Sequence, residues 1–134
     1  YRAAEHVGWR DISGVLAPLD AEELADHDAE QSAWMAELRR VGLLDAEADE
    51  EDVIAALYRY LARTPSKLLA LALADAVGDR RTQNQPGTTD EYPNWRVPLA
   101  GPDGTPLLLE DVFTDRRAAA LAEVLREATE PDTD

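Results

Sequence analysis

The residues of this sequence that are best suited to bind a ligand lie in one loop-like stretch, NQPGTTDEYPNWRVPL, residues 84–99. Asn84 and Gln85 carry hydrogen-bond donors and acceptors that can bind sugar hydroxyls or satisfy buried backbone groups. Tyr92 and Trp95 can stack on a sugar ring or fill a hydrophobic core. The residue types alone leave a binding loop and a structural plug as equal alternatives.

Two prolines and a glycine shape the backbone of the same stretch. Pro86 and Pro93 each fix φ, and Gly87 permits a turn that other residues resist. A segment of this kind is neither helix nor strand, and loops of that type either carry function or close a core.

Outside this loop the sequence offers no recognisable catalytic or metal-binding motif. It has no cysteine, and neither His6 nor His27 has a partner at the spacing of a zinc site or a catalytic dyad. His27 is interpreted as a structural residue. The acidic run DAEADEED, residues 45–52, lacks the glycine and alternating ligands of a calcium loop and is typical of a helix start. We expect no catalytic residue, metal or cofactor in this chain.

The negative charge excludes several kinds of partner. The chain has 134 residues and a net charge of −15, whereas nucleic acids and anionic membranes are bound by clustered Lys and Arg. The longest apolar run, residues 68–74, is too short to span a bilayer. No signal-peptide pattern is visible, so we expect a cytoplasmic protein, and the Ala- and Arg-rich composition suggests a GC-rich bacterial genome.

Helical patterns flank the loop on both sides. Asp20 caps a predicted helix that ends near Gly42. A second helix follows the acidic run and ends before a Pro-containing turn at residues 64–65. A final helix is predicted over residues 115–127, with a frayed tail over 129–134. Residues 1–16 suggest a short irregular helix.

The segment SKLLALALADAVG, residues 66–78, is ambiguous. Its Leu and Ala content favours a helix. Leu69, Leu71 and Leu73 alternate with alanines, however, and a short apolar run behind a turn is also typical of a buried strand. Composition alone favours the helix.

The motifs NQPGT and EYPNWR resemble the C-terminal signature of glycoside hydrolase family 77, the 4-alpha-glucanotransferases or amylomaltases. The similarity is continuous over residues 61–99, and it is looser in EHVGWRD and ELRRVGLL. The chain begins at Tyr1, and the resemblance implies that it is the C-terminal piece of such an enzyme.

The resemblance implies a fold that is mainly α in this piece and forms the last part of a (β/α)8 barrel. Residues 1–63 would be helical, residues 64–83 would hold the last barrel strand (about 67–73) and a turn of helix, and residues 115–127 would close the barrel. The loop at 84–99 would leave the C-terminal end of a barrel strand, where such barrels build active sites. The rest of the barrel would then be the chain's main partner.

The resemblance also implies the activity and the site residues. Enzymes of this family transfer α-1,4-glucan segments between maltodextrins by a retaining mechanism that uses two carboxyl groups, and these would precede the matched region. Asn84 and Pro86 would bind substrate, while Tyr92, Asn94 and Trp95, with Arg96 beside them, would support the loop. No metal or cofactor is implied, and the chain alone would be inactive. Two alternatives stay open: a non-enzymatic acidic helical interaction module and a small carbohydrate-binding module.

Overall fold

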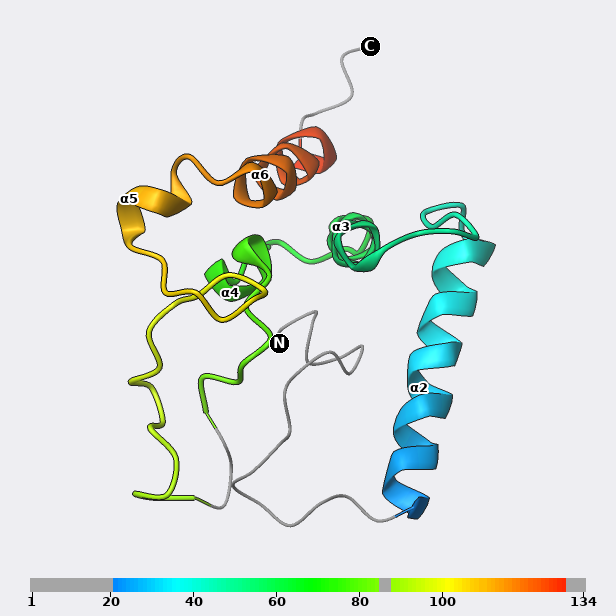
Figure 1. Ribbon diagram of the computed structural model, residues 1–134. Helices are drawn as coiled ribbons and strands as arrows, with labels where there is room; N and C mark the ends of the chain where they lie inside the picture. The colour runs from blue at the N-terminus through cyan, green and yellow to red at the C-terminus, as the bar shows by residue number, and fades with distance from the viewer. Residues whose placement is uncertain (1–20, 85–87, 130–134) are drawn as a thin grey trace.

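The computed structural model describes residues 21–84 and 88–129, which form five helices (Figure 1). They are α2 (Ala21–Arg40), α3 (Glu50–Ala62), α4 (Leu73–Val77), α5 (Leu109–Val112) and α6 (Arg116–Thr129). No strand occurs in these two ranges, where a single antiparallel bridge joins Ala100 to Pro106. The predicted irregular helix over 1–16, the Asp20 cap, Pro86 and most of the predicted tail lie outside the described residues.

Helix α3 is the centre of the core, and its start is set by the acidic run. The side chain of Asp49 accepts from the Asp52 N–H and that of Asp52 from the Asp49 N–H, which together form a capping box. The expectation that this run begins a helix is confirmed. Helix α3 buries four apolar side chains and one tyrosine: Val53, Ile54, Ala56, Leu57 and Tyr58.

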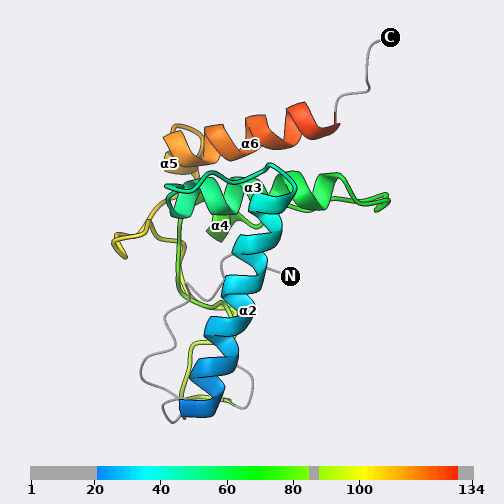
Figure 2. The same cartoon turned by 90° about the vertical axis from the view of Figure 1, so that its right-hand side faces the viewer.

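Helices α4 and α6 pack against α3 to form a small layered core. Figure 2 shows α6 lying along α3, with α4 below them. Leu121 and Val124 of α6 are buried in one cluster with the apolar residues of α3. Glu51 at the start of α3 pairs with Arg116 and Arg117 at the start of α6, at 2.9 and 2.6 Å. These ion pairs are partly exposed, so the apolar contacts are the larger contribution.

Among the described residues, the C-terminal half of helix α2 packs against the core. Leu38 is fully buried, and the rings of Trp34 and Tyr60 meet edge to face with centroids 5.6 Å apart. The helix ends where the sequence predicts, because Gly42 adopts φ +71° and the Leu43 N–H bonds back to the Leu38 carbonyl. The N-terminal half of α2 extends away from the layer formed by α3, α4 and α6 (Figure 1). Within the described residues no helix combines the length and the apolar character that a membrane crossing requires.

The predicted strand over residues 67–73 is not formed as a strand. Residues 68–72 lack a ladder partner, Leu68 is 91% exposed, and α4 already begins at Leu73. A strand needs the backbone of a neighbour, and none of the described segments lies alongside. Tyr58 Oη instead accepts the Ala72 N–H at 3.1 Å. The predicted turn of helix after this segment is present as α4, which Gly78 ends with φ +77°.

The final helix is confirmed close to its predicted bounds. The prediction covers residues 115–127, and α6 runs from Arg116 to Thr129. Asp115 accepts the Ala118 N–H at 2.9 Å, as an N-cap residue does. The preceding short helix α5 was not predicted, and it exposes Leu108, Leu109 and Phe113 to solvent.

Candidate functional site

The stretch 84–99 belongs to a loop whose two ends meet just after α4 in the sequence (Figure 1). We call the meeting point, formed by Asp79, Arg81, Pro98 and Ala100, the neck of the loop. The outgoing leg is residues 79–84 and the returning leg is residues 88–100. Asp79 is the centre of that neck and is only 1% exposed. Its carboxylate accepts the Ala100 N–H at 3.1 Å, so it ties the outgoing chain to the returning chain. The same carboxylate accepts the backbone N–H and the guanidinium of Arg81, each bond being 3.0 Å.

Arg81 makes a second tie across the neck. One of its guanidinium nitrogens donates to the Pro98 carbonyl at 2.5 Å while it also bonds Asp79. The side-chain hydrogen bond that Arg81 donates to Asp79 raises the pKa of Arg81 above its ordinary value. A buried carboxylate is stable only when it is paired and hydrogen-bonded, and this fork provides both.

Below the neck, two further bonds brace the legs of the loop. Tyr92 Oη donates to the Thr82 carbonyl at 2.5 Å, and the Trp95 N–H donates to the Gln83 carbonyl at 2.7 Å. Thr82 Oγ1 donates to the Asn84 carbonyl at 2.8 Å. The backbone is therefore fixed up to Asn84.

The two asparagines of the loop are used differently. Asn94 Nδ2 donates to Thr88 Oγ1 at 2.9 Å, so its side chain is part of the framework. Asn84 is half-buried, and within the described residues its side-chain amide makes no hydrogen bond. Pro86, the other predicted substrate-binding residue, lies outside the described residues.

The side chain of Trp95 is 77% exposed among the described residues. Its predicted support of the loop would therefore have to come from contacts with the rest of the barrel, and it stays a prediction. The Trp95 backbone adopts φ +60°, the left-handed region that an aromatic residue rarely occupies. The backbone N–H of Trp95 donates to the Gln83 carbonyl. Among the described residues, the side chains of Tyr92 and Asn94 support the loop.

The tip of the loop carries a local carboxylate turn. Glu91 accepts the Thr89 N–H at 2.7 Å and the Thr89 hydroxyl at 3.1 Å. These bonds, led by the one from the Thr89 backbone, lower the pKa of Glu91 from its usual 4.5. The carboxylate is solvent-exposed and serves the turn.

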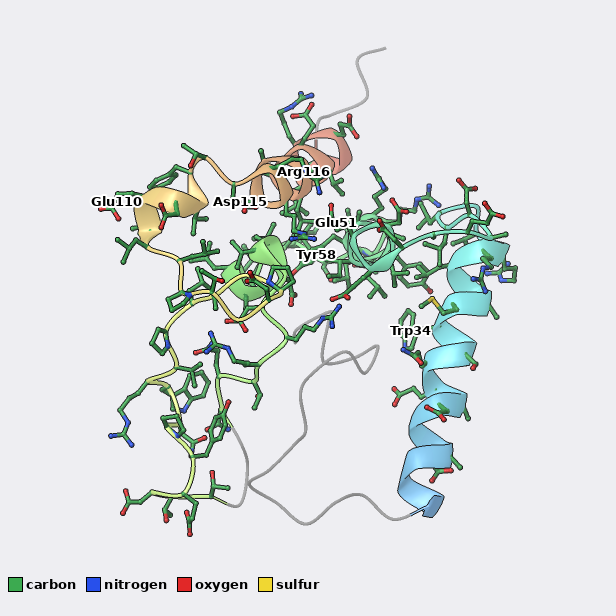
Figure 3. The ribbon with its side chains drawn as sticks, in the orientation of Figure 1. Trp34, Glu51, Tyr58, Glu110, Asp115 and Arg116 are labelled. Carbon is green, nitrogen blue, oxygen red and sulfur yellow. The ribbon has the colours of Figure 1, made fainter. Side chains whose placement is uncertain are left out.

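A cavity of about 410 Å³ lies apart from this loop. Residues of α3, α4 and α6 line it, and none of its described lining residues belongs to 84–99. Figure 3 shows Glu51 and Arg116, which line it, meeting across the two helices. Both carboxylates and arginines line its walls, and several of them form ion pairs. No group of three metal-ligating side chains occurs in the described part of the chain.

Asp79 is the site residue that sequence reasoning missed. It follows the glycine that ends α4 and precedes Arg80 and Arg81. An acid followed two residues later by Arg is a signal for a local fork, but 28 acidic residues obscure it.

Comparison with known proteins gives consistent matches. The sequence model of the 4-alpha-glucanotransferase family matches residues 5–103. Proteins described as 4-alpha-glucanotransferase from Mycobacterium tuberculosis and Mycobacterium bovis are 67% identical over 132 residues. The crystal structure of amylomaltase from Corynebacterium glutamicum superposes with a TM-score of 0.74 and 32% identity over 90% of this chain.

The matched relatives are much longer than this chain. It covers 18% of the mycobacterial proteins and 19% of the corynebacterial amylomaltase. The similarity extends over nearly all of the present residues, 96% in the mycobacterial comparison.

Proposed function

The chain belongs to the 4-alpha-glucanotransferase family, and from that premise we propose that it is the C-terminal part of an enzyme that transfers α-1,4-glucan segments between maltodextrins. The transfer would follow a retaining mechanism, with an aspartate nucleophile and a glutamate acid/base. Both carboxylates would lie in the part of the enzyme outside these residues. Membership of the family disfavours the interaction-module and carbohydrate-binding-module alternatives.

Within that enzyme, this chain would supply one wall of the glucan site. The observation that carries this proposal is the contrast between the two asparagines: Asn94 is used by the framework, while the Asn84 amide is left available on a fixed backbone. An amide offers two donors and one acceptor, which suits the vicinal hydroxyls of a glucose unit. Pro86, two residues on, would shape the backbone beside the sugar.

The remainder of the barrel would cover the apolar surface that this chain exposes. Leu73 at the start of α4 is 50% exposed and Phe113 after α5 is 79% exposed. Residues 68–72 have no ladder partner among the described residues, as expected of a strand whose neighbours lie elsewhere. We propose that residues 67–73 pair as the last barrel strand and that α6 closes the barrel.

The setting of the enzyme remains a prediction. A bacterial origin agrees with the mycobacterial source of the matched relatives. A cytoplasmic location and a role in glycogen and maltodextrin metabolism rest on the resemblance to the family.

A transfer assay tests the proposal. The 134-residue chain and a full-length protein carrying it would each be incubated with maltotriose, and glucose release followed together with the appearance of longer maltodextrins. We expect both products from the full-length protein and none from the chain above a heat-killed control. Turnover by the chain would show that it holds its own catalytic groups, and absence of transfer by the full-length protein would contradict the proposed activity.

A further inference from the structure

Asp79 is a buried carboxylate that, among the described residues, bonds both sides of the neck of the loop. It touches the outgoing leg through Arg81 and the returning leg through the Ala100 N–H. Charged side chains are almost never fully buried unless they are paired. Because the Asp79 carboxylate is only 1% exposed, its burial depends on the bonds that it makes.

Arg81 extends this fixed point across the neck of the loop to the Pro98 carbonyl. Its guanidinium is held by Asp79 in a two-point fork and reaches the Pro98 carbonyl from that position. Arginine in a planar fork loses little freedom for each bond formed. Asp79 thus determines where the outgoing leg lies relative to the returning leg.

Hydrogen bonds hold each of the residues between Arg81 and Asn84 in place. Thr82 follows Arg81 directly and is held through its carbonyl by Tyr92, and Gln83 is held through its carbonyl by Trp95. The hydroxyl of Thr82 then bonds the Asn84 carbonyl. Arg81, Thr82 and Gln83 all take part in this network. The exposed Arg80 pairs instead with Glu50 of α3.

We propose that Asp79, acting through Arg81, is a positioning residue for substrate binding that sets the place of the Asn84 amide. This inference rests on the proposed function, because the amide is taken to bind the glucan. Asp79 itself would touch no substrate. Its loss should therefore cost activity only as far as Asn84 contributes to activity.

A double-mutant cycle in the full-length protein tests this dependence. We expect Asp79→Asn to lower kcat/KM for maltotriose by about 10- to 100-fold, the scale on which a displaced binding group reduces rate. Asn84→Ala should lower it by roughly 5- to 150-fold, the value of one hydrogen bond to a sugar. In the double variant the Asp79 substitution should add less than about twofold, since coupled sites are not additive.

Two further variants separate positioning from stability. Arg81→Lys retains the charge but loses the fork, so it should repeat the effect of Asp79→Asn and its dependence on Asn84; it decides the question if Asp79→Asn fails to fold. Glu51→Gln removes a comparable ion pair between α3 and α6. It should change kcat/KM per folded molecule by less than about twofold, with or without Asn84.

The outcomes are distinguishable. Loss of the Asp79 or Arg81 effect in the Asn84→Ala background supports the inference. An effect of equal size in both backgrounds would overturn it, because Asp79 would then act on folding or on another part of the site. A wild-type protein without glucan transfer would instead refute the proposed function, and with it the inference.

Discussion

Replacing Tyr58 with Phe should destabilise the fold strongly although it removes a single oxygen. Tyr58 is 2% exposed, and its hydroxyl donates to Asp75 Oδ2 at 2.9 Å while it accepts the Ala72 N–H at 3.1 Å. Figure 3 shows it between α3 and α4. The hydroxyl therefore joins the central helix both to α4 and to the extended segment before it.

The expected cost follows from these two bonds. A hydrogen bond to a charged group contributes about 1.5–3 kcal/mol, and a buried N–H that loses its acceptor costs about 1–3 kcal/mol. The phenyl ring stays in place and no cavity of methyl size forms. Because the two terms overlap, we expect the free energy of unfolding to fall by about 2–4 kcal/mol, a large part of the roughly 5–15 kcal/mol of a typical domain.

Urea unfolding followed by circular dichroism measures this change. With a slope of about 2 kcal/mol per molar urea, the midpoint should fall by about 1–2 M. Tyr60→Phe is the matched control, since it makes the same change on the same helix where no hydroxyl bond is present among the described residues. It should shift the free energy of unfolding by less than about 0.5 kcal/mol. Equal midpoints for the two variants would refute the role assigned to the Tyr58 hydroxyl.

Two other predictions concern the side chain of Trp95 and the stability of the chain at low pH. Trp95→Ala should lower the free energy of unfolding of the 134-residue chain by less than about 0.5 kcal/mol, because the side chain is 77% exposed; a loss of about 3–5 kcal/mol in thermal melting would show it to be packed. Glu37, Glu91 and Glu123 have pKa values lowered from 4.5, Glu37 by its bond to Arg40, Glu91 by the Thr89 backbone and Glu123 by its bond to Arg126. Their stabilisation should be complete above pH 4.5 and be lost as the pH falls through the lowered values; a urea midpoint that rises on acidification below pH 4.5 would contradict this.

The helices could be predicted because their signals are local. The run before α3 supplies its capping carboxylates, Gly42 and Gly78 supply the left-handed ends of α2 and α4, and Asp115 begins α6. Each of these depends on residues a few positions apart, which a sequence displays directly.

The strand and the loop interior depend on distant partners and could not be predicted in the same way. Residues 67–73 have strand-like alternation, but a ladder requires neighbouring strands, and the described part of the chain supplies none. The composition of the loop could not tell that Tyr92 would be tied and Trp95 exposed, because both are large aromatics. Asp79 is distinguished from the many surface acids only by its burial and by the return of Ala100 to its side.

The central claim is that this chain contributes the Asn84 amide to a glucan site, and Asn84→Ala in the full-length protein tests it most directly. Asp90→Asn, an exposed change in the same loop, serves as the control. The account predicts that kcat/KM for maltotriose falls roughly 5- to 150-fold in Asn84→Ala, with an unchanged melting temperature and no effect in the control. Unchanged kcat/KM, or a loss of activity that only follows a lower melting temperature, would contradict it.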